Sequence, residues 1–355
     1  GSRGDFPAYP WTGNDRNPYY NKNDATCEHL WEHLPMYNME GKKIVSDRPN
    51  LAKVHPLPFN AIAMAYEAHI GHAPLFYKVD GNPDTSPMNH NPSDKPREEV
   101  DELAAERGMV RMSMGRALGQ SYHLSDGIWS DGTDCTTQVP GLYAAGDCLG
   151  ARSGYPMAGF AAAFCAVSGA RAGVNAARFS DEHGWNGLDR DEIAGLKGVL
   201  WGPKERKGGF TPQWALQVLQ DVVTPYWVLL YKREDRLQAA LNYVGFMRDH
   251  IVPQLMAYDN HDLRLVHEVR NIVLHMEMKL RASLFRKESR WYHYREDYPL
   301  RDDENWLCWV KIQDVNGEMT LSKVPIPEKW RPDPTVPYAE RYPCKFPNEP
   351  QDLPD

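Results

Sequence analysis

Hydrophobic positions beyond about residue 211 recur with the period of an α-helix and predict three helical segments. In the second segment the apolar positions are Leu237, Leu241, Val244, Met247, Ile251 and Leu255. In the third segment they are Leu263, Val266, Val269, Val273, Met276, Leu280 and Leu284. Spacings of three and four place one apolar stripe on each helix, as antiparallel bundle helices require. The sequence therefore predicts a three-helix bundle, with Pro225 and Pro253 ending or bending its segments.

The middle of the chain predicts a helix of another kind. Almost every residue of 156–177 is small or apolar, which predicts a helix packed tightly on most of its circumference. Residues 141–145, which precede it, have the composition of a short buried strand. Further upstream, residues 58–70 predict a helix and residues 74–79 a strand.

The chain becomes rich in proline and aromatic residues after residue 295. Val315-Asn316-Gly317 predicts the turn of a β-hairpin, because an Asn-Gly pair tolerates the positive φ angles that a two-residue turn requires. The last thirty or so residues are predicted to form an extended arm.

Composition and charge narrow the functional classes. The chain has 355 residues, enough for two or three domains, and its 42% apolar content is that of a folded globular protein. A net charge of −8 gives no basic field, so we expect no nucleic-acid partner. No apolar stretch is long enough for a membrane span.

The six cysteines are scattered and form no CxxC pair. Metal or iron–sulfur ligation normally needs clustered thiolates, so we expect no metal or cluster on this chain. The chain shows no signal peptide, and reduced thiols are then expected. We therefore expect a cytoplasmic location.

The segment PGLYAAGDCLGA, residues 140–151, carries the strongest candidate chemistry. A strand that ends in Gly146-Asp147 can direct one carboxylate beyond its edge, where open α/β sheets bind ligands. That carboxylate can accept hydrogen bonds from vicinal hydroxyls, and the glycine lets the backbone approach closely. The alternative is a plain core strand that ends in an aspartate turn.

The string VPGLYAAGD resembles the second FAD-contact motif of the fumarate reductase/succinate dehydrogenase flavoprotein family. The resemblance implies that Asp147, next to Gly146, binds the ribityl chain of FAD. It also implies that the start of the next helix faces the isoalloxazine edge, which assigns cofactor contacts to Ala158, Gly159, Phe160 and Ala161.

Candidate substrate residues follow from the same resemblance. In SYHLSDGI, His123 precedes Gly127-Ile128 as the family's substrate-binding His precedes its Gly-Ile; a structural histidine is the alternative. The family's arginine at the following helix has no direct counterpart, and Arg152 is the nearest candidate. Arg3, in GSRGDFP, resembles an arginine of the family's capping domain. The resemblance implies a small anionic substrate, although Ser125-Asp126 departs from the usual Met-Gly.

A long sequence signature follows the last predicted helix of the bundle. Residues 286–309, RKESRWYHYREDYPLRDDENWLCW, are similar to the family signature R-x-E-S-R-x-x-x-x-R-x-D-[YF]-P-x-x-D-D-E-N-W. Four of its charged residues alternate closely in sign: Arg290, His293, Arg295 and Asp297. They predict an ion-pair network that fixes the bundle to the flavin domain. We expect an architectural role, with Arg286 and Arg290 also contributing to the electrostatics of the site.

Among the branches of the family, the chain looks most like the alpha subunit of dissimilatory adenylylsulfate reductase. EAHIGHAPLFYKVD and the aromatic C-terminal arm carry this resemblance. It implies a ferredoxin-like iron–sulfur electron-transfer subunit as partner, which agrees with flavin motifs on a chain without cluster cysteines.

The first FAD contact of the family, a strand–GxGxxG–helix unit, has no matching window in the sequence. The resemblance therefore covers only the C-terminal portion of a family member. Either a separate chain supplies the N-terminal FAD-binding half, or this is a processed or truncated fragment.

The expected fold is α/β plus α, with a partial, Rossmann-like FAD-binding domain. The domains are a remnant capping and wrapping segment at 1–110, the FAD-binding part at 111–180, the helical bundle at 181–295 and the C-terminal arm at 296–355.

The predicted function is an FAD-dependent oxidoreductase acting by two-electron flavin chemistry. One alternative is a flavin-free scaffold or electron-transfer subunit, which the absent GxGxxG favours. Another is a pyridine-nucleotide disulfide reductase, which the lack of CxxC disfavours.

Overall fold

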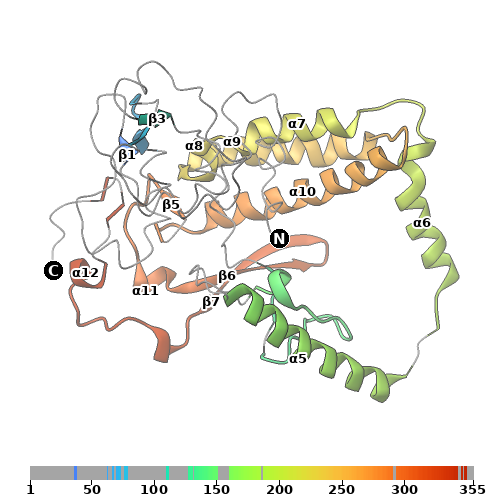
Figure 1. The fold of residues 1–355 in the computed structure, drawn as a ribbon, viewed down its shortest axis with the longest axis horizontal. Helices are drawn as coiled ribbons and strands as arrows, with labels where there is room; N and C mark the ends of the chain where they lie inside the picture. The colour runs from blue at the N-terminus through green and yellow to red at the C-terminus, as the bar shows by residue number, and fades with distance from the viewer. Residues whose placement is uncertain are drawn as a thin grey trace. The chain divides into compact units, whose positions relative to one another are not determined.

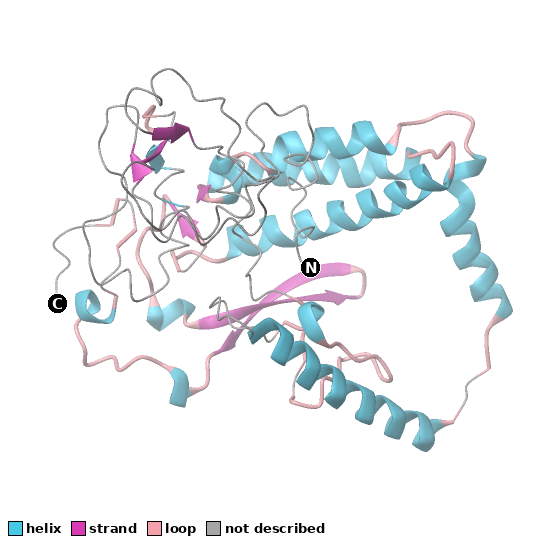
Figure 2. Ribbon diagram, in the orientation of Figure 1, coloured by secondary structure: helices cyan, strands magenta, loops and turns pink. Residues whose placement is uncertain are grey.

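The computed structural model of the chain describes residues 36–37, 62, 66–67, 69–72, 76–78, 109–111, 127–130, 132–150, 160–184, 187–290, 293–342, 345–346 and 348–349. It divides the chain into unit 1 (residues 1–2 and 121–206) and unit 2 (residues 3–120 and 207–355). Helices outnumber strands among the described residues (Figure 2), so the structure is mixed α and β with mostly helices.

Three long helices of unit 2 lie side by side (Figure 1). They are α7 (Pro212–Val223), α9 (Glu234–Phe246) and α10 (Asn260–Phe285). The short α8 (Tyr226–Leu229) follows Pro225, which stands at its N-cap. The three predicted helical segments are confirmed, and Pro225 separates the first from the second.

Each bundle helix begins at a residue that satisfies or removes a free backbone N–H group. Pro212 opens α7 and has no N–H group to leave unpaired. Asp259 caps α10 by accepting a 2.8 Å hydrogen bond from the Asp262 N–H. At the start of α9, the Asp297 carboxylate accepts the Glu234 N–H at 3.1 Å from 63 residues further along the chain.

Pro253 ends the helix that continues α9. The α-helix passes into a π-turn, η7 (Met247–Ile251), and then a 3-10 turn, η8 (Val252–Gln254). Proline lacks an N–H group and its ring would clash with the carbonyl four residues earlier, so the α-helical ladder cannot continue. The Gln254 side-chain amide donates to the His250 carbonyl at 2.7 Å and satisfies one backbone acceptor.

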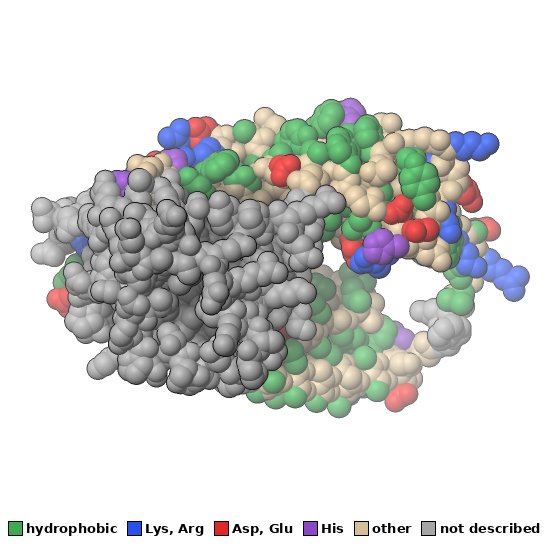
Figure 3. Space-filling model, turned by 45° about the horizontal axis from the view of Figure 1, so that its top comes forward, with side chains coloured by type: hydrophobic (Ala, Val, Ile, Leu, Met, Phe, Trp, Pro, Cys, Tyr) green, Lys and Arg blue, Asp and Glu red, His purple; other side chains and the backbone are tan. Residues whose placement is uncertain are grey.

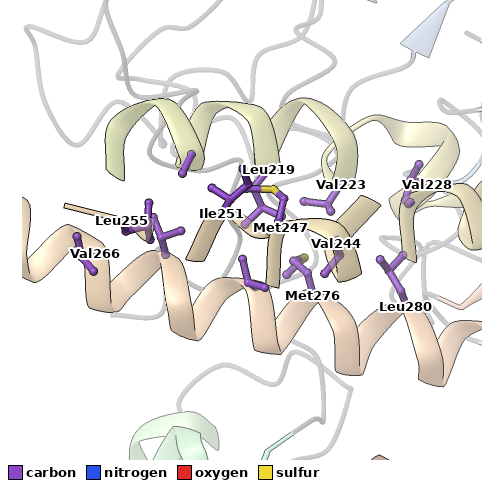
Figure 4. Close-up of a cluster of buried hydrophobic side chains, with 14 of the residues drawn as sticks. Leu219, Val223, Val228, Val244, Met247, Ile251, Leu255, Val266, Met276 and Leu280 are labelled. Carbon is purple, nitrogen blue, oxygen red and sulfur yellow. The ribbon is translucent and has the colours of Figure 1, made fainter. Parts of the chain in front are cut away.

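The hydrophobic core of unit 2 lies between these helices (Figure 4). Leu219 of α7, Met247 of η7 and Met276 of α10 point toward one another and are almost completely buried. Every residue of the two predicted apolar stripes belongs to this core, with only Leu241 and Leu284 partly exposed. Burying one such side chain contributes about 1.5–3 kcal/mol to the free energy of unfolding, so these helices provide much of the stability of unit 2.

The predicted hairpin is formed by β6 (Cys308–Val315) and β7 (Glu318–Pro325), which pair antiparallel along their whole length. Asn316 and Gly317 have φ angles of 55° and 86°, as a two-residue turn of this hand requires. The Asp314 carboxylate accepts the Gly317 N–H at 2.7 Å and fixes the turn.

The described part of the C-terminal segment folds back onto unit 2 instead of extending as an arm. After η9 (Glu328–Trp330), the chain forms α12 (Tyr338–Arg341). Glu349 is buried and pairs with buried Arg301 at 3.2 Å. Removing two charges from water requires such pairing, so this contact anchors the segment.

The remaining strands of unit 2 are short. β1 (Met36–Tyr37), β2 (Phe76–Lys78) and β3 (Met109–Arg111) form an antiparallel sheet, with β2 inside the predicted strand 74–79. β4 (Tyr231–Lys232) and β5 (Tyr294–Arg295) pair in parallel. The described residues of 58–70 include helical positions 62, 66, 67 and 69, consistent with the predicted helix.

Unit 1 contains α5 (Phe160–His183), α6 (Arg190–Glu205) and the short 3-10 turn η6 (Gly146–Cys148). Of α5, Ser168 and Ala172 are buried, whereas Val167 and Val174 are 50% and 61% exposed. The helix is therefore packed along one face, and the prediction of packing on most of its circumference is wrong. Small residues permit close packing, but a helix is covered only where another element reaches it.

In the part of the face that Figure 3 colours, acidic and basic side chains are interspersed. Among the described helices, none combines the length and the apolar character that crossing a membrane requires.

Candidate functional site

The Gly-Asp motif lies at the end of a loop that folds back on itself in unit 1. The Ala144 N–H donates to the Cys135 carbonyl at 3.0 Å, and the Thr137 N–H donates to the Leu142 carbonyl at 3.1 Å. Between them the backbone makes one isolated bridge, from Thr136 to Tyr143. The predicted strand at 141–145 is wrong, because the segment pairs with its neighbour only through this isolated bridge and turns at the positive φ angles of Gly141 and Gly146 on either side.

Gly146 makes the turn that presents Asp147. Its φ angle is +66°, a conformation that residues with a side chain seldom adopt. A Cβ atom at this position would lie 3.3 Å from the Cys165 sulfur of α5, a close contact. Glycine therefore suits this position both for its backbone angle and for its lack of a side chain.

Helix α5 holds this turn through Ser168. The Ser168 hydroxyl accepts the Gly146 N–H at 2.9 Å and donates to the Phe164 carbonyl at 2.5 Å. The Cys135 thiol in turn lies 3.6 Å from the Ser168 carbonyl oxygen, as a donor to it. Sequence reasoning missed Ser168. Its only signal was a hydroxyl within a run of alanine, glycine and valine.

Asp147 itself is exposed on the surface of unit 1. The Cys165 thiol lies 3.7 Å from its Oδ1 atom, at the long end of a sulfur hydrogen bond. A carboxylate that is open to solvent on one side can accept hydrogen bonds from two neighbouring hydroxyls of a ligand. The residues present therefore fit the ribityl-binding role that the motif resemblance implies.

A second glycine motif is held against this turn. The Ile128 N–H donates to the Cys148 carbonyl at 2.7 Å, and the Gly150 N–H donates to the Ile128 carbonyl at 2.9 Å. A Cβ atom on Gly127 would lie 2.7 Å from the Cys148 carbonyl oxygen, so only glycine fits. The structure thus brings together the Gly-Ile pair of the His123 motif and the Gly-Asp turn, two segments that the resemblance assigned to one site.

The remaining predicted site residues lie at the start of α5 or outside the described residues. Phe160 and Ala161 are the first two residues of α5, as the predicted helix start requires, but their side chains are not described. The others lie outside the described residues: Arg3, His123, Arg152, Ala158 and Gly159. Their roles stay predictions.

The ESR…DDENW signature of unit 2 forms an ion-pair network around Glu288, whose side chain is fully buried. Arg290 donates to both of its carboxylate oxygens at 2.9 Å, and Arg286 also pairs with it. Burial alone would lower the pKa of Arg290, but the Glu288 carboxylate holds that pKa above its ordinary value. The predicted ion pairs of Arg290 and of Arg295 with Asp297 are confirmed, whereas the His293 ring contacts the Arg286 carbonyl. That the network fixes the bundle to the flavin domain stays a prediction.

The network extends to the C-terminal segment. Asp303 accepts from Arg290 at 2.6 Å and from the Tyr342 hydroxyl at 2.6 Å, and it pairs with Arg341 at 2.5 Å. Arg341 and Tyr342 of the C-terminal segment thus contact the same Asp303 carboxylate as Arg290 of the signature. These contacts lie wholly within unit 2 and connect the end of α10 to the segment around α12.

Basic side chains gather beside this network. Burial and the nearby Lys279 and Arg295 lower the pKa of Lys232 well below its ordinary value. Burial lowers the pKa of His293 in the same way, with Lys232 and the arginines adding to the effect. Arg295, fully buried, is paired with Asp297 at 2.6 Å.

Groups of three or more His, Cys, Asp or Glu side chains suited to a metal ion are absent from the described residues.

Comparison with known proteins places these features in a class. Residues 218–341 match the sequence profile described as "Fumarate reductase flavoprotein C-term". This span begins within α7 and includes α9, α10 and the ESR…DDENW signature, but the Gly146–Asp147 turn lies well before it. Over this span the chain is similar to fumarate reductase-type flavoproteins.

Two curated relatives show similarity of the same kind. The chain is 31% identical over 171 residues to an FAD-dependent oxidoreductase of Methanocaldococcus jannaschii, covering 48% of this chain and 31% of the relative. It is 29% identical over 199 residues to the 8-methylmenaquinol:fumarate reductase flavoprotein subunit of Wolinella succinogenes, covering 52% of this chain and 32% of the relative. The matched segments thus span about a third of each relative's length.

The fold agrees with a solved structure of adenylylsulfate reductase from Archaeoglobus fulgidus, with a TM-score of 0.56 and 22% sequence identity. The match covers 87% of this chain and 57% of the other. These similarities support the resemblance that the motifs indicate: the chain is similar in sequence to the C-terminal portion of flavoproteins of the fumarate reductase family.

Proposed function

We propose that this chain is the C-terminal portion of an FAD-dependent oxidoreductase of the fumarate reductase/adenylylsulfate reductase type. The observation that carries the proposal is the Gly146–Asp147 turn, a glycine with φ of +66° that presents an exposed aspartate beside α5. Its motif resembles the family's second FAD contact. The relatives named as FAD-dependent oxidoreductase and fumarate reductase support the same class.

Within this proposal, Asp147 binds the ribityl hydroxyls and orients the cofactor along the start of α5. The free N–H groups of the first helical turn, near Phe160 and Ala161, favour negative charge at the pyrimidine edge of the flavin. FAD, when bound, supplies the two-electron chemistry. His123, with Arg3 and Arg152, binds the anionic group of a small substrate.

The proposal also assigns partners. A diphosphate group normally needs the amide cradle and dipole of a glycine-rich helix start, and the sequence has no such window. We therefore assign the first FAD contact to residues that correspond to the rest of the longer relatives, in this or another chain. An iron–sulfur subunit is the proposed electron partner, since this sequence has no clustered cysteines.

The visible spectrum of the protein purified from its native source, with all its partners, tests the proposal. A flavin band in stoichiometric amount with this chain is expected. A colourless preparation that contains the chain and its natural partners would refute it.

A substitution tests the role of the aspartate. Asp147→Ala should lower flavin occupancy, because the ribityl hydroxyls lose a charged acceptor. The matched control is Asp181→Ala, at an exposed position of α5, which should keep full occupancy. Full occupancy in Asp147→Ala would contradict the assignment.

The absence of a GxGxxG window favours a second candidate, a flavin-free scaffold or electron-transfer subunit. The exposed aspartate argues against it: the packing of the turn against α5 accounts for Gly146, but it does not account for the carboxylate of Asp147. The same spectrum separates the two candidates.

A further inference from the structure

We propose that Ser168 is the positioning residue of the flavin site: its hydroxyl holds the Gly146 N–H and thereby sets the direction of Asp147. This inference rests on the function proposed above. It concerns a residue that neither the motifs nor the family resemblance assigns to the site.

The backbone around Asp147 explains why a side chain is needed there. Gly146 is the first residue of η6, and the N–H groups at the start of a helical turn have no partner within the turn. The preceding residue, Ala145, cannot cap the turn because its side chain has no acceptor. Ser168, 22 residues further along the chain, supplies the missing acceptor at 2.9 Å.

The orientation of the hydroxyl is determined by its second contact. A serine hydroxyl has one proton, and Ser168 donates it to the Phe164 carbonyl at 2.5 Å. Its lone pairs are then available to the Gly146 N–H group. Because Ser168 is only 3% exposed, water does not readily replace this bond, and the turn is held by a buried contact.

Packing alone does not call for serine at this position. Ala172, one turn later on the same face of α5, is also buried, so alanine is accommodated against this loop. A serine that bonds back to the carbonyl four residues earlier slightly destabilises a helix. The hydroxyl therefore lowers the stability of the helix slightly, at a position where a methyl group would fit. In exchange it accepts the hydrogen bond from the Gly146 N–H group.

The turn also packs closely against α5 through the contact of Gly146 with Cys165. The Cα of Gly146 lies so close to the helix that a Cβ atom would be 3.3 Å from the Cys165 sulfur. Cys165 also contacts Asp147 Oδ1 at 3.7 Å. Ser168 and Cys165, one turn apart on α5, thus hold the backbone and the side chain of the turn respectively.

The test measures FAD affinity in the complete protein, with every segment and partner it has in its native source. Ser168→Ala should raise the dissociation constant of FAD about tenfold, the effect of one buried N–H group left without its acceptor. Ser168→Thr keeps the hydroxyl and should restore affinity to within about twofold. Ser180→Ala, an exposed serine of the same helix, is the matched control and should bind FAD as the wild type does.

Two further readouts separate positioning from a general loss of structure. The Gly146 amide should exchange its hydrogen faster in Ser168→Ala without flavin present, whereas the amides in the middle of α5 should keep their protection. In an Asp147→Ala background, Ser168→Ala should have little additional effect on FAD affinity, because a residue that acts through Asp147 cannot act without it.

The outcomes are distinct. If Asp147→Ala weakens FAD binding and Ser168→Ala does not, the positioning role is refuted while the proposed function stands. Full additivity of the two substitutions would also refute it. If the wild-type complete protein binds no FAD, the proposed function fails, and this inference fails with it.

Discussion

Glu288 offers the sharpest test of how the signature segment stabilises unit 2. Its carboxylate is fully buried and accepts four hydrogen bonds, one from Arg286, two from Arg290 and one from the Asp302 N–H. Glu288→Gln preserves the shape of the side chain but removes the charge. It also turns an N–H₂ group toward donors that previously met an oxygen atom.

The magnitude follows from these contacts. Removing one partner of a buried ion pair costs about 3–5 kcal/mol, because the remaining charge is left without compensation. Arg290 keeps Asp303 at 2.6 Å and is 25% exposed, so the lower end, about 3 kcal/mol, is expected. With a urea dependence of about 1–3 kcal/mol/M, the unfolding midpoint should fall by about 1 M or more.

The assay is urea unfolding of the chain followed by circular dichroism at 222 nm. Glu268→Gln is the matched control, since Glu268 pairs with Arg264 on the surface of α10 and is 44% exposed. Its midpoint should stay within error of the wild type, because exposed ion pairs contribute little. An unchanged midpoint in Glu288→Gln would refute the buried-network reasoning.

Three further substitutions test other parts of unit 2. Gly209→Ala should destabilise the chain severely, because the new Cβ would lie 2.1 Å from the Gln254 carbonyl oxygen; Gly245→Ala, within α9 and without neighbours at 4 Å, should instead raise the unfolding free energy by about 1 kcal/mol. Burial and Lys232 lower the pKa of His293 in the folded state, so the unfolded state takes up a proton first as the pH falls below about 6.5. Stability should then fall by up to about 1.4 kcal/mol per pH unit, and His293→Asn should flatten this slope between pH 6.5 and 5; equal slopes would contradict the assignment.

The bundle could be predicted from the sequence because its signal is local. Apolar residues at spacings of three and four define the buried face of a helix wherever its partners come from, and Pro225 and Pro253 interrupt helices for reasons internal to the residue. The Asn316-Gly317 turn was equally predictable, since its positive φ angles are a property of those two residues.

Contacts between distant segments were beyond prediction. The apolar run at 141–145 has the composition of a strand, but a strand also needs a neighbour, and the loop found there pairs only through an isolated bridge. The C-terminal residues gave no periodic signal, although Glu349 is buried against Arg301. A buried ion pair depends on two side chains meeting, and sequence spacing does not encode that meeting.

By itself, the sequence determined the helical bundle, the hairpin and the motif that identifies the Gly146–Asp147 turn, because local periodicity and backbone preference suffice for each. Only the tertiary structure decided that Ser168 holds this turn and that Asp297 caps α9 from 63 residues away. The physical reason is the same in both cases. An unpaired N–H group requires an acceptor within hydrogen-bond reach, but any element that folds close enough can supply it.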